Sequence, residues 1–246
     1  MLFRQIVFSA LCVGLLSGLL LTAVQQLHLT PIIFSAEQYE SPEPQVSGHH
    51  HQAHDHHHDT EVWSPADGTE RLAYSTLSNI LAGIGFAILL LALMSQLQPS
   101  GLTTLTPVKG LAWGVAGFIA FFVAPGLGLP PEIPGIEAAP VSSRQTWWIL
   151  TVLATAVGIA LLFFVPKNLK VIGCIFIVVP HLIGAPLTNG PEFSQTDPAV
   201  VAVLSQLHQQ FILVSGACNL IFWIALGFGS AIVLERWVLK NVGLTR

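Results

Sequence analysis

Residues 77–97 read LSNILAGIGFAILLLALMSQL and contain no Asp, Glu, Lys or Arg. A helix of about 20 apolar residues covers the ~30 Å hydrocarbon core of a bilayer, so this stretch predicts a membrane-spanning helix. The whole chain shares this character, because only 9% of its 246 residues are charged and the mean hydropathy is +0.69. Soluble domains carry roughly 25% charged residues. The composition therefore argues against a water-soluble enzyme.

Five more stretches have the length and composition of membrane spans. They cover residues 6–24, 110–129, 147–165, 171–187 and 211–234. The stretch 171–187 is the weakest, because it is short and contains Pro180, His181 and Pro186, so a chain with five spans is the alternative. The fold prediction is an all-α integral membrane protein, a bundle of about six transmembrane helices. Residues 1–246 are expected to form a single polytopic membrane domain.

The distribution of charge predicts the orientation of these helices, because Lys and Arg favour the cytoplasmic side. With the amino terminus inside, seven of the nine basic residues fall inside and twelve of the thirteen acidic residues fall outside. Both termini are therefore predicted to be cytoplasmic. An acidic outer face would concentrate cations at the entrance. The chain has no Lys/Arg cluster, which argues against nucleic acid as a partner.

Two features concern the helices themselves. The first apolar run is too long for a secretory signal, so we expect an uncleaved first helix. Gly14 and Gly18, and likewise Gly110 and Gly114, have GxxxG spacing. This spacing favours close packing between helices of the same chain over dimerisation.

Residues 25–71 form the largest segment between spans, and their composition predicts a disordered, histidine-rich loop on the outer side. Imidazoles and carboxylates are ligands for Co²⁺, Ni²⁺, Zn²⁺ and Cu²⁺. A flexible tract captures ions without enforcing a geometry, so we interpret it as a collector of metal; a solvated run without a role is the alternative. The candidate ligands are His49, His50, His51, His54, Asp55, His56, His57, His58 and Asp59.

His181 is the candidate ligand within the membrane. It lies about 15 Å along the helix from Val171, near the bilayer midplane, and an ionisable residue at that depth is a functional candidate. Pro180 and Pro186 cannot donate backbone hydrogen bonds, which frees two helical carbonyls to coordinate a cation beside the imidazole. The alternative is a kinked helix whose histidine hydrogen-bonds a neighbouring helix.

Glu132 is the only charged residue in the Pro/Gly-rich segment 124–135 and is a candidate for the outer mouth of a pathway; a solvated Glu in a rigid turn is the alternative. Downstream, Arg144 is expected to pair with Glu132 or Glu137. Trp147 and Trp148 are expected to anchor the next helix at the outer interface.

Three further polar residues are weaker pathway candidates. Asn79 and Asn219 lie inside predicted spans, where each could line a pathway or hydrogen-bond between helices. His208 precedes the last span and faces the same outer side as the histidine tract.

Several motifs are absent from the sequence. There is no GxxxxGK[ST] loop for a nucleotide, and neither HExxH nor GxSxG occurs. The chain is therefore not expected to hydrolyse ATP or to be an enzyme, and no permanently bound cofactor is expected.

Four segments in order resemble the CbtA family of predicted cobalt transporter subunits. They are MLFRQIVFSALCVGLLSGLLLT at 1–22, GLGLPPEIPG at 126–135, SRQTWW at 143–148 and VPHLIGAP at 179–186. The resemblance implies a bacterial inner-membrane protein that takes up Co²⁺ for cobalamin synthesis, with a small one-span partner of the CbtB type. It places Glu132, Arg144, Trp148 and His181 within family motifs.

The function prediction is a permease, or permease subunit, for a divalent transition metal, with cobalt first and nickel second. The tract would gather the ion, Glu132 would admit it, and His181 would coordinate it. The rival interpretation is a metal-binding membrane sensor or assembly protein that does not transport.

Overall fold

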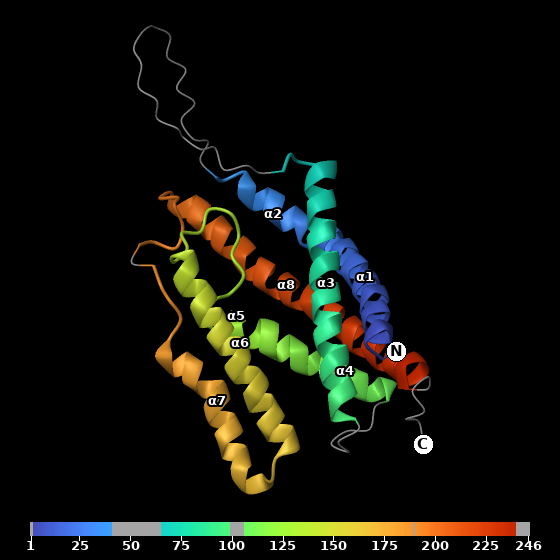
Figure 1. Ribbon diagram of the computed structural model, residues 1–246. Coiled ribbons are helices and arrows are strands. Elements are labelled where there is room, and N and C mark those ends of the chain that lie inside the picture. Colours follow the sequence, from blue (N-terminus) through green and yellow to red (C-terminus); the bar gives the residue numbers. More distant parts are fainter. Residues whose placement is uncertain (1, 41–64, 99–105, 189, 240–246) are drawn as a thin grey trace, which may run out of the picture.

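The computed structural model describes residues 2–40, 65–98, 106–188 and 190–239, which form helices joined by irregular segments (Figure 1). The elements are α1 Leu2–His28, α2 Thr30–Glu37, α3 Thr69–Leu97, α4 Pro107–Phe118, the π-helical η1 Ile119–Val123, α5 Ala124–Gly126, α6 Val141–Phe164, the 3₁₀ turn η2 Lys167–Leu169, α7 Lys170–Ile183, α8 Pro198–Val233 and the π-helical η3 Leu234–Leu239. The all-α prediction is confirmed. The prediction of a disordered loop over 25–71 is wrong at both ends, because α1 continues to His28, α2 covers Thr30–Glu37 and α3 begins at Thr69. The histidine tract at 49–59 lies outside the described residues.

Within the described ranges, five helical stretches are long and apolar enough to cross a membrane. They are Phe3–His28, Thr69–Leu97, Pro107–Gly126, Val141–Phe164 and Pro198–Trp237. The stretch predicted as a span at 171–187 is helical only to Ile183, so α7 has 14 residues. That is about 21 Å, short of the ~30 Å hydrocarbon core. The helix stops where Gly184 adopts a φ of +86°, and Pro186 has no N–H with which to continue it.

Although α7 is short, the chain still crosses from the end of α6 to the start of α8. The segment 184–197 covers the rest of the distance after α7 ends. Figure 1 shows the start of α1 and the end of α8 at one end of the bundle, with α2 and the starts of α3, α6 and α8 at the other. The end where α1 starts, the basic end, holds Arg4, Lys109, Lys167, Lys170 and Arg236, with Glu235. The opposite, acidic end holds Glu37, Glu40, Asp67, Glu70, Glu132, Glu137, Glu192 and Asp197, with Arg71 and Arg144.

Glycines bring the long helices into backbone contact, as the GxxxG spacing predicted within one chain. A Cβ on Gly18 would lie 2.6 Å from the Cα of Ile80 in α3, and one on Gly110 would lie 2.6 Å from the Cβ of Ala231 in α8. Real Cβ atoms essentially never approach so closely. The pairs α1–α3 and α4–α8 therefore depend on residues without side chains at these crossings.

The third span is interrupted by a π-helical turn. The N–H of Ala124 donates to the carbonyl of Ile119, five residues back. The next residue is Pro125, which has no N–H and whose ring crowds the carbonyl four residues earlier, so a wider turn relieves the clash. The helix then ends at Gly126, about midway along the bundle in Figure 1.

The irregular segments that follow the broken helices, 127–140 and 184–197, form a cap at the acidic end. They meet at an antiparallel bridge between Ile136 and Phe193. The backbone N–H of Glu137 donates to Glu192 O at 3.1 Å, and that of Ser194 donates to Gly135 O at 3.2 Å. The cap is sealed by a cluster of buried side chains from α2, both segments and α8, namely Leu29, Ala36, Ile133, Phe193, Leu204 and Phe211. The cap is therefore a packed part of the fold.

The glycine contacts predict a sharp contrast between two positions on α3. A Cβ on Gly83 would lie 2.5 Å from Gly14 O, whereas one on Gly85 meets nothing within 4 Å. We expect Gly83→Leu to separate α1 from α3 and to lower the free energy of unfolding by about 1–3 kcal/mol. Thermal unfolding of the detergent-solubilised protein measures this. Gly85→Leu is the matched control, and equal melting temperatures for the two variants would contradict the packing assigned here.

Candidate functional site

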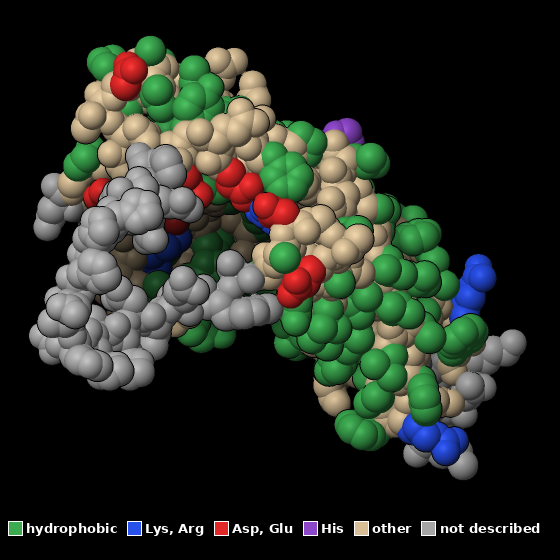
Figure 2. All heavy atoms as spheres, turned by 90° about the horizontal axis from the view of Figure 1, so that it is seen from above, with side chains coloured by type: hydrophobic (Ala, Val, Ile, Leu, Met, Phe, Trp, Pro, Cys, Tyr) green, Lys and Arg blue, Asp and Glu red, His purple; other side chains and the backbone are tan. Residues whose placement is uncertain are grey.

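The cap borders an open cavity of about 240 Å³ whose lining includes five ionisable side chains. Glu132 and Glu137 come from the first cap segment, Glu192 from the second, Arg144 from α6 and His208 from α8. Figure 2, which looks onto the acidic end, shows carboxylates gathered around a hollow in that face. Three carboxylates outweigh one guanidinium, so the cavity attracts cations. Six waters occupy about 180 Å³, so a hydrated ion fits such a volume.

His208 is held at this cavity by oxygens on both of its ring nitrogens. Its Nδ1 lies 3.0 Å from Glu192 Oε1, and its Nε2 lies 3.0 Å from the carbonyl oxygen of Pro131. The imidazole is nearly buried, with Phe193 edge-on against it at 6.4 Å between ring centroids. A carboxylate that accepts from one ring nitrogen fixes the ring and leaves the other nitrogen directed at a metal position, as in many protein metal sites. Here the second nitrogen, Nε2, faces the Pro131 carbonyl oxygen, so an ion would have to displace that contact before His208 could bind it.

Glu132 and Arg144 form an ion pair between this cavity and a second one. Arg144 Nη2 donates to Glu132 Oε2 at 2.6 Å. The sequence offered Glu132 and Glu137 as partners of Arg144, and Glu132 is the one that pairs with it. The second cavity, about 620 Å³, lies between η1, α5 and α6 and shares Leu129, Pro130, Glu132 and Arg144 with the first. The ion pair therefore stands where the two cavities adjoin.

His181 lies in the last turn of α7, apart from this cavity. Its ring is half-buried and edge-on to Trp147, with 5.9 Å between ring centroids. Trp147 was expected as an anchor at the membrane interface, but its side chain is buried. Its Nε1 donates to Pro180 O at 3.1 Å, which connects the end of α7 to α6. Trp148 is the more exposed of the pair and lines the second cavity.

The two asparagines make internal hydrogen bonds. The Asn79 amide in α3 donates to Thr22 Oγ1 and Gln25 Oε1 of α1 at 3.0 and 2.7 Å. The Asn219 amide donates to Ser215 O one turn earlier in α8, at 3.0 Å. Asn79 therefore hydrogen-bonds between two helices, as one of its two interpretations expected, whereas Asn219 hydrogen-bonds within its own helix. Of the two motif prolines, Pro186 lines the smaller cavity.

The residues on either side of the histidine tract are held at the acidic end. Arg71, in the first turn of α3, donates to Glu37 of α2 at 2.6 Å and to Asp67 at 3.2 Å. Gln195 of the cap donates to Tyr39 O at 2.7 Å. The chain therefore leaves for residues 41–64 and returns from them beside the cap.

The described ranges contain no group of three or more His, Cys, Asp or Glu placed to hold a metal ion together. An ion in the cap cavity would therefore keep water as part of its coordination shell. Sequence reasoning singled out Glu132 and His208 but missed Glu192, because a carboxylate in an irregular segment, 16 residues before its histidine partner, carries no periodic signal.

The ion pair of Glu132 with Arg144 can be tested by a double-mutant cycle. Both side chains are about three-quarters buried, so we expect a coupling free energy of about 1–3 kcal/mol between Glu132→Gln and Arg144→Gln. Thermal unfolding of the two single variants and the double variant measures it. Additive effects of the two substitutions would show that the pair contributes nothing to the cap.

The comparisons with known proteins agree with this membrane architecture. The family model CbtA, described as a probable cobalt transporter subunit, matches residues 3–235, which include both cap segments and His208. Searches of curated proteins and of solved structures gave no match. A family of transporter subunits is not a family of enzymes. The chain belongs to the CbtA family of probable cobalt transporter subunits.

Proposed function

We propose that the chain is the permease subunit of an uptake system for a divalent transition metal. Cobalt, taken up for cobalamin synthesis, is the first candidate, and nickel is the second. The observation that carries this proposal is the His208 imidazole, which lies between Glu192 and the Pro131 carbonyl at a cavity with an excess of carboxylates. An imidazole with oxygen donors suits Co²⁺ and Ni²⁺. No ion has to be held permanently, since Co²⁺ or Ni²⁺ is the cargo.

The charge of the two ends supports a proposed orientation. We propose that the basic end faces the cytoplasm of a bacterial inner membrane and the acidic end faces outward. The histidine tract at 49–59 would then collect ions next to the cap, because its flanking residues are fixed there by Arg71.

The passage of the ion is proposed to begin in the cap cavity. There the cation exchanges part of its water for His208 and carboxylate oxygens. A divalent cation competes with Arg144 for Glu132, and release of that carboxylate opens the way to the second cavity, which borders the broken end of α5. His181 remains a proposed ligand at greater depth, at the end of α7.

The exposed end of α7 supports a partner subunit. Leu182 and Leu187 are 79% and 82% exposed, and within the described residues the N–H groups of Ala185 and Leu187 have no hydrogen-bond partner. Unpaired backbone groups at membrane depth are costly in lipid. We propose that a small one-span subunit of the CbtB type covers this end.

Flux of labelled Co²⁺ into proteoliposomes, with the chain alone or together with the one-span subunit, tests transport. We expect His208→Gln to lower uptake about 10-fold to 100-fold. His28→Gln is the matched control, since His28 is an exposed histidine at the same end of the bundle.

Wild-type flux in His208→Gln would remove His208 from the pathway. Metal binding without flux in either preparation would favour the sensor or assembly protein. Elemental analysis of cells grown in mixed trace metals, with and without the protein, decides between cobalt and nickel.

The histidine tract is proposed to act at scarce metal only. Replacing its seven histidines by glutamine is expected to raise the cobalt concentration for half-maximal uptake and to leave the maximal rate unchanged. Uptake measured across a cobalt series checks this. A lower maximal rate would place the tract in the transport step itself.

A further inference from the structure

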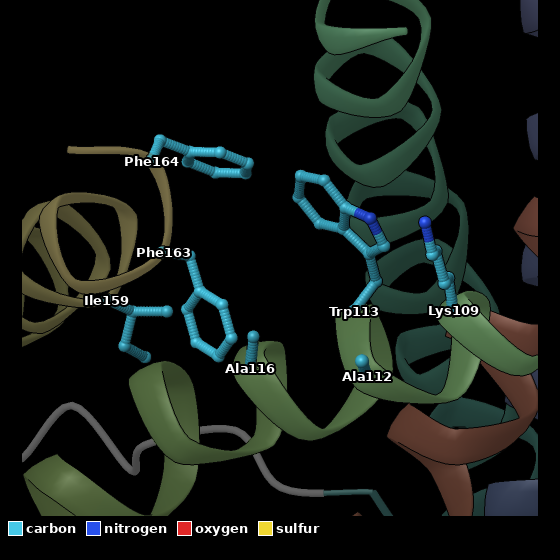
Figure 3. Close-up of a pocket in the computed structure, with 7 residues that line it drawn as sticks. All are labelled: Lys109, Ala112, Trp113, Ala116, Ile159, Phe163 and Phe164. Carbon is cyan, nitrogen blue, oxygen red and sulfur yellow. The ribbon is translucent and has the colours of Figure 1, made fainter. Parts of the chain in front are cut away.

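A cleft of about 320 Å³ lies between α4 and α6 at the basic end, far from the cap. Lys109, Ala112, Trp113 and Ala116 of α4 form one wall, and Ile159, Phe163 and Phe164 of α6 form the other (Figure 3). Nothing in the function proposed above uses this cleft, and the inference drawn from it does not depend on cobalt transport.

The cleft is polar at its mouth and apolar inside. Lys109 lies in the first turn of α4, where the helix begins at the basic end, and Trp113 follows one turn later. Figure 3 shows the amino nitrogen of Lys109 and the indole nitrogen of Trp113 on the same side of α4, with the rings of Phe163 and Phe164 across the cleft. Ala116 and Ile159 lie deeper, so the lining changes from two N–H donors to hydrocarbon within two turns.

The height of the cleft limits what can occupy it. Lys109 and Ala116 are seven residues apart, about 10 Å along the helix, which is within one leaflet of a ~30 Å hydrocarbon core. Above that level η1 approaches α6, where the rings of Phe121 and Trp148 are 6.1 Å apart between centroids. A membrane-spanning helix of a partner needs the full height, whereas the acyl chain of a lipid from one leaflet does not.

The mouth selects the headgroup. A lysine ammonium and an indole N–H are both donors, and none of the described residues that line the cleft is acidic. Basic pockets between helices at the cytoplasmic side of membrane proteins bind anionic lipid headgroups. We propose that this cleft binds one anionic phospholipid of the leaflet at the basic end, with its phosphate at Lys109 and Trp113 and an acyl chain between α4 and α6.

The bound lipid has a structural consequence. α4 and α6 diverge toward the basic end (Figure 1), and the acyl chain fills the wedge between their apolar walls. The position of the α6–α7 hairpin relative to α4 then depends on the lipid in the surrounding leaflet.

Quenching of tryptophan fluorescence tests the proposal on the full chain in phosphatidylcholine vesicles. Small amounts of phosphatidylglycerol or phosphatidylcholine with brominated acyl chains are added as probes. We expect brominated phosphatidylglycerol to quench with an apparent affinity about fivefold higher than brominated phosphatidylcholine. Trp113→Phe should remove the additional quenching, which identifies Trp113 among the six tryptophans as its source.

The variants locate the charge that selects the lipid. Lys109→Gln should abolish the preference for phosphatidylglycerol, and Lys109→Arg should retain it. Lys170→Gln, at the same end of the bundle but outside the lining of the cleft, is the matched control and should behave as wild type. Equal quenching by the two lipids in the wild type, or an unchanged preference in Lys109→Gln, would overturn the proposal. Monodisperse elution of each variant in detergent verifies that it folds.

Discussion

The fold depends on one constraint, that every backbone N–H and C=O within the hydrocarbon layer must find a hydrogen-bond partner. α1, α3, α6 and α8 meet it by unbroken helix over their apolar length. Two apolar helices are broken, one after Gly126 and one after Ile183, and both breaks lead into the cap. There the backbone hydrogen bonds around the bridge between Ile136 and Phe193 replace part of the lost helical bonding. The indole of Trp147 and the packing against α2 hold the segments in place. The ionisable cavity exists because the two cap segments are not helical, so their carboxylates meet Arg144 of α6 and His208 of α8.

Helix breaks in a membrane protein also supply what a cation needs. A helix hides its carbonyls within its own hydrogen bonds, whereas an irregular segment can direct them at an ion. The Pro131 carbonyl, which faces His208, belongs to such a segment and is followed by Glu132. The His208 imidazole of α8 thus meets the Glu192 carboxylate and the Pro131 carbonyl, one from each cap segment. Pro131 and His208, 77 positions apart in the sequence, are brought together by the same breaks that interrupt the helices.

The sequence predicted the long helices well, because composition and length alone identify apolar spans. It also predicted that the glycine pairs pack helices of the same chain together, and that Arg144 pairs with Glu132 or Glu137. It did not predict where α7 ends, because Gly184 ends the helix through a positive φ that the sequence pattern does not indicate. Nor did it reveal the buried place of Trp147 or the contact of Glu192 with His208, both of which arise from the packing of segments far apart in the chain.

We propose that His208 provides the nitrogen ligand for a divalent ion at the acidic end. X-ray absorption at the cobalt edge tests this role directly, on the full chain with the seven tract histidines replaced by glutamine and loaded with one equivalent of Co²⁺. We expect a single imidazole among oxygen ligands, and its loss in the additional variant His208→Gln. An imidazole signal that survives in His208→Gln, or a cobalt shell of oxygen alone before that substitution, would rule His208 out as this ligand.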